Sequence, residues 1–277
     1  RGLGDVYQRQ TLAKHACHIR MGVIEGTHSA KCGHPGGSLD IAEVLSYLYF
    51  VDMNVDPENP KAPDRDRLVL SKGHAAPALY SVLANRGFFP VDELKTLRHI
   101  GSRLQGHPNM NLTPGVDMST GSLGQGVSTA AGMALGAKHL GKDTKVFALV
   151  GDGESQEGQI WEAYMAAAHY KLDNLTVIID NNGLQIDGET KDVMPTEPLD
   201  KKFESFGWHV IKIDGHDFDQ IEAAYKEAEQ TKGQPTMILA KTIKGKGVSF
   251  MENNAGWHGK APNDEQWAQA KAELEAQ

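Results

Sequence analysis

The sequence contains little cysteine, no long apolar run and no signal-peptide pattern. Only Cys17 and Cys32 are cysteines among its 277 residues, and no CxxC pair occurs, so a disulfide framework or a structural zinc site is not expected. We expect Cys32 to be a small buried thiol without a reactive role. No apolar run approaches the ~20 residues of a membrane span, and the first residues, RGLGDVYQRQ, lack the apolar core of a signal peptide. These features predict a cytoplasmic protein.

Positive charge is also scarce. The formal net charge is −8, which argues against a nucleic acid or an anionic membrane as the main partner. The hydrophobic content of 40% and the charged content of 23% are ordinary for a globular protein, and the chain is long enough to bury a substantial core. The composition therefore favours an ordinary globular protein that binds neither nucleic acid nor membranes.

Short apolar or β-branched runs recur along the chain, at 67–71, 145–150, 175–180, 208–213 and 236–242. Helical patterns lie between most of them, and continuously apolar strands that alternate with helices indicate a mainly parallel sheet covered on both faces. We therefore predict an α/β fold with one mainly parallel central sheet. No repeat, low-complexity tract or long linker occurs, so a single domain over residues 1–277 is expected.

The two ends of this domain are predicted to be helical. Residues 1–60 follow mainly helical patterns, and Asp40 and Glu43 have the spacing of a capping box for the second helix there. The tail at 261–277 is expected to form a closing helix.

An acid and an amide follow two consecutive predicted strands. Asp152 lies between two glycines directly after the strand at 145–150, and Asn182 follows the strand at 175–180. Open parallel sheets bind ligands at the carboxyl ends of their strands, and consecutive strands are usually neighbours. We therefore expect the two side chains to lie close together.

Carboxylate and amide oxygens are ligands suited to Mg²⁺ or Ca²⁺. One negative charge holds Mg²⁺ poorly, so the remaining oxygens should come from a diphosphate. Gly153 leaves room for close approach, and a helix expected to begin near Ser155 would favour an anion. The same residues also fit a plain strand–helix turn with a capping aspartate, and their spacing leaves both interpretations open.

Two other nucleotide- or metal-like motifs fail on one position each. GAKHLGKD has Asp143 where a Walker A loop needs Ser or Thr, and DNNGLQIDGE has Gln185 where a calcium loop needs glycine.

The stretch from GDG to Asn182 resembles the thiamine diphosphate fingerprint, in which an acid, an asparagine and a nearby carbonyl hold the cofactor's divalent ion. The resemblance implies thiamine diphosphate as cofactor, and Asp152, Asn182 and the Leu184 carbonyl as ligands of Mg²⁺, with Ca²⁺ or Mn²⁺ as substitutes. Five further segments look like transketolase segments in the right order: CGHPGGSLDIAEVL, LSKGHAAPALYSVLANRG, LRHIGSRLQGHP, STGSLGQGVSTAAGMALG and GWHGKAP. The resemblance to transketolase extends from about residue 10 to residue 262.

The same resemblance implies roles for four histidines that adjoin glycine. It places His34 and His107 at the donor sugar, and His74 and His258 between the diphosphate and the substrate. Imidazole suits these roles because it can donate, accept and transfer protons near neutral pH. Any one of these histidines alone would usually be a solvated loop residue. His216 also adjoins glycine but matches no catalytic position.

Further cofactor contacts are implied by the resemblance. Gly121 and Leu123 match backbone contacts to the aminopyrimidine, and Ile186 matches an apolar contact to the thiazolium. Glu157 matches an acid that pairs with another acid across a subunit interface, although it equally fits an exposed carboxylate in a first helical turn. The remaining implied cofactor-binding residues belong to the fingerprint itself: Gly151, Asp152, Gly153 and Asn182.

A second α/β domain is missing from the sequence. Transketolases are more than twice as long, so the pyrimidine-binding domain, with the glutamate that activates the aminopyrimidine, is expected on another chain. The resemblance thus implies the N-terminal subunit of a split transketolase, whose partner is a C-terminal subunit in an α2β2 assembly. The expected reaction transfers a two-carbon ketol unit from a ketose phosphate to an aldose phosphate, for which the cofactor supplies the difficult chemistry.

Other interpretations stay open. The alpha subunit of a 2-oxo acid dehydrogenase has a similar cofactor stretch, but GHPGG, SKGH and the late WHG do not fit it. 1-Deoxyxylulose-5-phosphate synthase shares a KGKG run like that at 244–247, yet IDNNGLQIDG and GHPGG favour transketolase. Split transketolases for sulfonated or branched sugars, and a non-catalytic module that only binds the cofactor, also remain.

Overall fold

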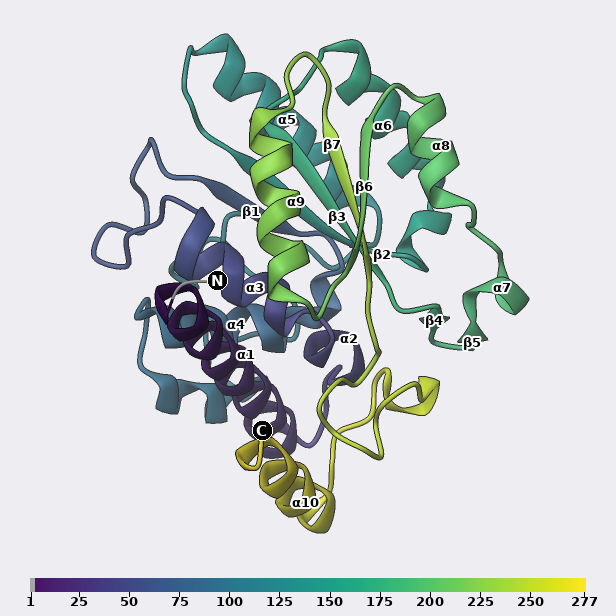
Figure 1. Cartoon of the computed structure of the whole chain (residues 1–277). Coiled ribbons are helices and arrows are strands. Elements are labelled where there is room, and N and C mark those ends of the chain that lie inside the picture. Colours follow the sequence, from purple (N-terminus) through teal and green to yellow (C-terminus); the bar gives the residue numbers. More distant parts are fainter. Residues whose placement is uncertain (1–2) are drawn as a thin grey trace.

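Five parallel strands form the central sheet of the computed structural model, which describes residues 3–277 (Figure 1). In the order β1-β2-β3-β7-β6, all neighbouring strands pair in parallel. The predicted mainly parallel sheet is confirmed, and each strand lies within one residue of its expected bounds. The strands are β1 (Arg67–Leu70), β2 (Val146–Gly151), β3 (Leu175–Asn181), β6 (His209–Asp214) and β7 (Thr236–Lys241), and a separate antiparallel hairpin consists of β4 (Leu184–Gln185) and β5 (Gly188–Glu189).

Helices make up much of the remaining chain. The α-helices are α1 (Leu3–Ala30), α2 (Gly36–Leu39), α3 (Ala42–Tyr47), α4 (Ala76–Arg86), α5 (Gln125–His139), α6 (Gly158–His169), α7 (Thr190–Val193), α8 (Leu199–Ser205), α9 (Phe218–Gln230) and α10 (Asp264–Glu275). The shorter helices are η1 (Leu48–Asp52), which is π-helical, and the 3-10 helices η2 (Gly73–Ala75), η3 (Val91–Thr96), η4 (Glu154–Gln156) and η5 (Ala255–Trp257). Near the C-terminus, α10 packs against α1 (Figure 1). None of the helices described is long and apolar enough to cross a membrane.

Side chains alternate along the strands between two cores. In β2, Val146, Ala148 and Val150 pack into one core, which α5, α6 and α8 complete. Phe147 and Leu149 pack into the other core, which contains buried residues of α1, α3, α4, α9 and α10. A parallel sheet with both faces covered produces this pattern, which explains why the inner strands β2, β3 and β7 are mainly apolar and buried. The edge strand β6 is only half-buried, with Lys212 and Asp214 exposed.

The capping box expected at Asp40 and Glu43 does not form. Helix α3 begins at Ala42 without a side-chain cap. Both carboxylates instead serve tertiary pairs, Asp40 with Lys72 and Glu43 with Arg20. Partners from distant segments therefore outweigh the local capping pattern.

The helix expected to begin near Ser155 begins at Gly158 instead. The 3-10 turn η4 occupies the residues directly after the GDG stretch, and Glu157 is extended, with φ −68° and ψ 122°. The N-terminus of α6 is therefore displaced from Asp152 by one short turn. Helix α4 ends at Arg86, where Gly87 takes the left-handed C-cap conformation with φ 100°. Cys32, expected to be buried, is exposed instead, because it lies shortly after the end of α1 at Ala30.

Candidate functional site

A cavity of about 340 Å³ lies at the carboxyl end of the sheet, where β2 and β3 are neighbours. Its lining comes from the segments that follow β1, β2, β3 and β7 and from the region around α2. The structure brings every predicted site residue except His107 into this lining. These residues are His34, His74, Gly121, Leu123, Gly151, Asp152, Gly153, Glu157, Asn182, Leu184, Ile186 and His258.

Asp152 is buried directly after β2, and the backbone holds both of its carboxylate oxygens. Oδ1 accepts a hydrogen bond from the Gly153 N–H at 2.7 Å, and Oδ2 accepts one from the Gly183 N–H at 2.6 Å. Burial and the nearby charge of Asp180 raise the pKa of Asp152 to about 6, although the two backbone donors act in the opposite direction. The carboxylate is thus fixed in position, and the charge of Lys244 acts on it without forming an ion pair.

The side-chain amide of Asn182 has a defined orientation. Its Nδ2 donates to Asp40 at 3.0 Å and to Asp180 at 3.1 Å. Because carboxylates accept hydrogen bonds, the NH₂ end must face them. Oδ1 therefore points the other way, where it accepts from the Leu184 N–H at 2.9 Å. Asn182 presents its oxygen on the side of Leu184, which lines the cavity.

Two buried lysines, which the sequence pattern did not single out, add positive charge. Lys72 donates to the Gly37 carbonyl at 2.7 Å and pairs with Asp180 and Asp40, so its charge is balanced within the protein. Lys244 is 2% exposed and lines the cavity, yet its ammonium makes no hydrogen bond or ion pair within the described part of the chain. Burial lowers the pKa of Lys244. A buried ammonium without a partner favours binding of an anion in this cavity.

Three of the predicted histidines form a cluster. The ring centroids of His34, His74 and His258 lie 5.0 to 5.4 Å apart. Burial, with a smaller contribution from nearby cationic groups, lowers the pKa of His34 to about 4, that of His258 to about 3, and that of His74 well below its ordinary value. Nδ1 of His34 and Nδ1 of His258 are buried without a hydrogen-bond partner among the residues described. All three rings line the cavity, and neutral imidazoles can hydrogen-bond hydroxyl and carbonyl oxygens.

His107 packs against Gly121 and is not part of the cavity lining. A Cβ atom on Gly121, which has φ 151°, would lie 3.1 Å from the His107 ring, so glycine allows the two segments to approach this closely. Burial and Arg98 lower the pKa of His107. Its role at the donor sugar stays a prediction.

Glu154 is a buried structural carboxylate that no sequence pattern marked. It accepts hydrogen bonds from Ser71 Oγ, from the Gly124 N–H at 2.8 Å and from the Gly151 N–H at 3.0 Å. It therefore joins the segment after β1, the start of α5 and the end of β2, and so fixes three walls of the cavity.

The rim of the cavity is open to solvent. Glu157 and Ile186 are exposed, and Ile186 is 64% exposed although it is a large apolar residue. Leu123 and Leu184 are half-buried. An apolar residue at an open rim suits contact with a ligand or with another chain.

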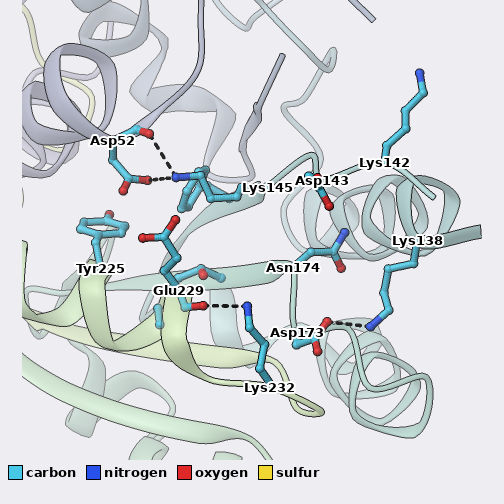
Figure 2. A pocket seen from close by; sticks show the side chains of 13 residues that line it. Asp52, Lys138, Lys142, Asp143, Lys145, Asp173, Asn174, Tyr225, Glu229 and Lys232 are labelled. Carbon is cyan, nitrogen blue, oxygen red and sulfur yellow. Dashed lines mark hydrogen bonds and ion pairs between the residues drawn. The ribbon is translucent and has the colours of Figure 1, made fainter. Parts of the chain in front are cut away.

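A second cavity, of about 410 Å³, lies at the opposite, amino end of β2 and β3 (Figure 2). No predicted site residue lines it. Lys145 pairs there with Asp52 at 3.1 Å, and Lys138 pairs with Asp173 at 2.6 Å. Because these charges are already paired within the chain, this cavity is a weaker candidate for binding a charged ligand.

The described residues contain no group of three or more His, Cys, Asp or Glu side chains that could hold a metal ion. A cation at Asp152 and Asn182 would therefore need further oxygens from a ligand. Together with the unpartnered Lys244, this donor set fits a polyanion that carries a divalent cation.

Comparison with known proteins identifies the family. The family described as "Transketolase, thiamine diphosphate binding domain" matches residues 11–277. A relative named 6-deoxy-6-sulfo-D-fructose transketolase subunit SqwG, from Clostridium sp. (strain MSTE9), is 49% identical over 268 residues, which cover 97% of this chain and 98% of the relative. A subunit of an apulose-4-phosphate transketolase from Phocaeicola vulgatus is 43% identical, with 96% of this chain and 95% of the relative covered.

Solved structures give the same result. Transketolase from Leishmania mexicana superposes with a TM-score of 0.91 at 35% sequence identity, over 95% of this chain and 41% of that transketolase. The chain thus spans less than half of the solved transketolase. The protein belongs to the transketolase family and contains its thiamine diphosphate-binding domain.

Proposed function

We propose that this chain is the cofactor-binding subunit of a two-chain transketolase, which moves a two-carbon ketol unit from a ketose phosphate to an aldose phosphate. The observation that carries the proposal is Lys244, a buried ammonium without a partner, in the same cavity as Asp152 and Asn182. A diphosphate bridged to a divalent cation would satisfy all three side chains. Two relatives of similar length are named as subunits, which supports the need for a partner chain.

The cavity residues fit thiamine diphosphate with Mg²⁺. The Asp152 carboxylate, Asn182 Oδ1 and the Leu184 carbonyl would hold the cation, for which Ca²⁺ or Mn²⁺ could substitute. Lys244 would neutralise the diphosphate, near Gly151 and the close approach at Gly153. The ring contacts proposed from the family resemblance are backbone contacts at Gly121 and Leu123 and an apolar contact at Ile186. When bound, the cofactor supplies a nucleophilic carbon that can attack a ketose carbonyl.

The clustered histidines would hold the sugar and move its protons. His34 and His258 line the cavity, and their neutral rings can hydrogen-bond sugar oxygens and accept a proton from a hydroxyl. His74, whose ring centroid lies 5.0 Å from that of His258, would lie between the diphosphate and the sugar. His107, which packs next to Gly121, would contact the donor. The pyrimidine domain of a C-terminal subunit, in an α2β2 assembly, would complete the site next to Glu157.

The experiment mixes the chain with a subunit that carries a transketolase pyrimidine domain, thiamine diphosphate and Mg²⁺, and assays xylulose 5-phosphate with ribose 5-phosphate. Turnover is expected only with both chains. Asp152→Ala should abolish cofactor-dependent activity, and His107→Ala should mainly lower kcat.

A matched pair of lysine variants tests the diphosphate contact. Lys244→Met should weaken cofactor affinity by roughly 10- to 100-fold, since a charged hydrogen bond contributes about 1.5–3 kcal/mol. Lys246→Met is the control, because Lys246 lies two residues away and is near Glu252, at 3.7 Å. Equal affinities in the two variants, or ketol transfer by the lone chain, would contradict the proposal.

A sulfonated ketose is the second candidate donor, because the 49% identical relative is named for 6-deoxy-6-sulfo-D-fructose. The same assay with that sugar in place of xylulose 5-phosphate distinguishes the two donors. A higher kcat/KM for the sulfonated donor would replace the ketose phosphate in the proposal.

A further inference from the structure

The segment that carries Lys244 is anchored by a histidine outside the cavity. Directly after β7, the Ile243 N–H donates to Nε2 of His216 at 2.9 Å, and the Gly245 N–H donates to the Gly36 carbonyl at 2.9 Å. His216 lies in the turn between β6 and α9 and does not line the cavity. Lys244 thus lies between two anchored backbone amides, one of which depends on a side chain.

The hydrogen bonds of His216 define its tautomer. A backbone N–H can only donate, so Nε2 of His216 must be unprotonated. The proton of the neutral ring is then on Nδ1, which lies 3.0 Å from Oε2 of Glu43. Arg20 donates to the same carboxylate oxygen at 2.7 Å. The ring orientation and its tautomer are therefore fixed from both sides.

This chain of contacts is shielded from water. Arg20 is 4% exposed and Glu43 is 7% exposed, and the His216 side chain is 12% exposed. Burial alone would raise the pKa of Glu43, but Arg20 and His216 outweigh it and lower that pKa. Glu43 is therefore a charged acceptor, and the contacts connect α1 and α3 through His216 to the segment after β7.

Gly215 allows the turn to pack against the end of β7. A Cβ atom at this position would lie 2.6 Å from Thr242 Cγ2 and 3.2 Å from Ala240 Cβ. The Gly215 N–H also donates to the Lys241 carbonyl at 2.8 Å. The close approach places His216 within reach of Ile243.

We propose that His216 is a positioning residue that, through its hydrogen bond to Ile243, keeps Lys244 in the wall of the cofactor cavity. Glu43 and Arg20 hold the His216 ring in the tautomer that this bond requires. The inference rests on the proposed function of Lys244 and extends it, because His216 itself touches neither cofactor nor substrate.

Two variants of the full chain separate the two hydrogen bonds of His216. The amide oxygen in His216→Gln is far enough from the backbone to accept from the Ile243 N–H, whereas the shorter amide in His216→Asn can reach only Glu43. Each variant is assembled with the subunit that carries the pyrimidine domain. We then expect the affinity for thiamine diphosphate with excess Mg²⁺, measured by titration calorimetry, to fall about tenfold in His216→Asn and to change less than about threefold in His216→Gln. A purely structural role predicts the same loss of affinity in both variants, and that result would overturn the proposal.

A second measurement does not depend on the cofactor. Long-range ¹H–¹⁵N NMR of the chain with labelled histidine should show the His216 proton on Nδ1. Hydrogen exchange at the Ile243 amide should be at least about tenfold faster in His216→Asn than in the wild type and little changed in His216→Gln. A proton on Nε2, or equal Ile243 exchange in all three proteins, would overturn the anchor. Failure of the wild type to bind thiamine diphosphate even when assembled with the partner subunit would instead refute the proposed function, while the NMR result would still decide the anchor.

Discussion

Burial keeps the clustered histidines uncharged, and this makes the stability of the cofactor-free chain depend on pH. The pKa of His34 is lowered to about 4 and that of His258 to about 3, chiefly by burial. The unfolded chain has ordinary histidines that take up protons below about pH 6.5. Between pH 6.5 and about 4 the unfolded state therefore binds more protons at these two positions than the folded state does. The contribution of the two histidines to the free energy of unfolding is complete above pH 6.5 and is lost as the pH falls.

We predict that His34→Gln flattens this dependence. Because the ring is partly exposed, we expect roughly 1 kcal/mol of acid-induced loss to disappear, less than the full pKa shift would give. Tm measured by circular dichroism from pH 7.5 to 4.5 should fall less steeply in this variant than in the wild type. His139→Gln, at an exposed position at the end of α5, is the control and should keep the wild-type slope. Parallel curves for all three proteins would contradict the prediction.

Site residues could be predicted from the sequence where their neighbours in the chain form a recognisable pattern. Residues whose environment comes from segments far away in the sequence could not be predicted. Asp152 and Asn182 could be found because each directly follows an apolar strand. Lys72 could not be assigned, since its partner Asp180 is 108 positions away. Lys244 is notable for having no partner, which only three-dimensional packing shows. Its place shortly after a strand that ends at this edge of the sheet was the one available signal.

Gly73 in η2 allows two segments beside the cavity to pack closely together. A Cβ atom on Gly73 would lie 2.6 Å from the Gly121 nitrogen and 2.7 Å from Thr120 Oγ1. The nearest of these atoms belongs to backbone, which cannot rotate away, so the segment after β1 and the segment before α5 can pack together only with glycine at this position.

We therefore predict that Gly73→Ala destabilises the chain by about 1–3 kcal/mol through overpacking and also weakens cofactor binding, because it displaces Gly121. Gly132→Ala in α5 is the matched control. Nothing lies within 4 Å of the Cβ position of Gly132, and alanine in a helix interior should stabilise by about 0.5–1 kcal/mol. Urea unfolding measures both effects, and changes of the same sign in the two variants would contradict this packing argument.

Helices and strands were predictable to the extent that local pattern decides them. The inner strands β2, β3 and β7 are buried on both faces, so their apolar runs mark them. Local signals failed where a tertiary contact replaced them. Asp40 and Glu43 have capping-box spacing, yet both face inward to Lys72 and Arg20. The start of α6 was missed because η4 precedes it, with Glu154 turned inward to hold three backbone and side-chain donors.

Across the whole molecule, the cavity is complete on the diphosphate side and open on the other. The acid, the amide and the lysines of the cavity are buried and its clustered histidines are half-buried, whereas Glu157 and Ile186 are exposed at the rim. An exposed apolar residue next to a charged cavity is consistent with burial by a further chain. We therefore expect the proposed C-terminal subunit to cover this rim, in a fixed ratio of one partner chain to one copy of this chain.

A titration of this chain with its partner at constant thiamine diphosphate and Mg²⁺ should then give activity that rises linearly and stops at equimolar ratio. Light scattering of the mixture should give a mass of two copies of each chain, since Glu157 is expected to pair with another acid across a subunit interface and most oligomers are symmetric. Asp152→Ala separates assembly from catalysis, because the buried Asp152 lies away from the rim: it should form the same complex with the same mass but show no turnover. Saturation at another ratio would contradict the equimolar assembly. A fully active complex of one copy of each chain would show that a single pair suffices and that symmetry is not part of the site.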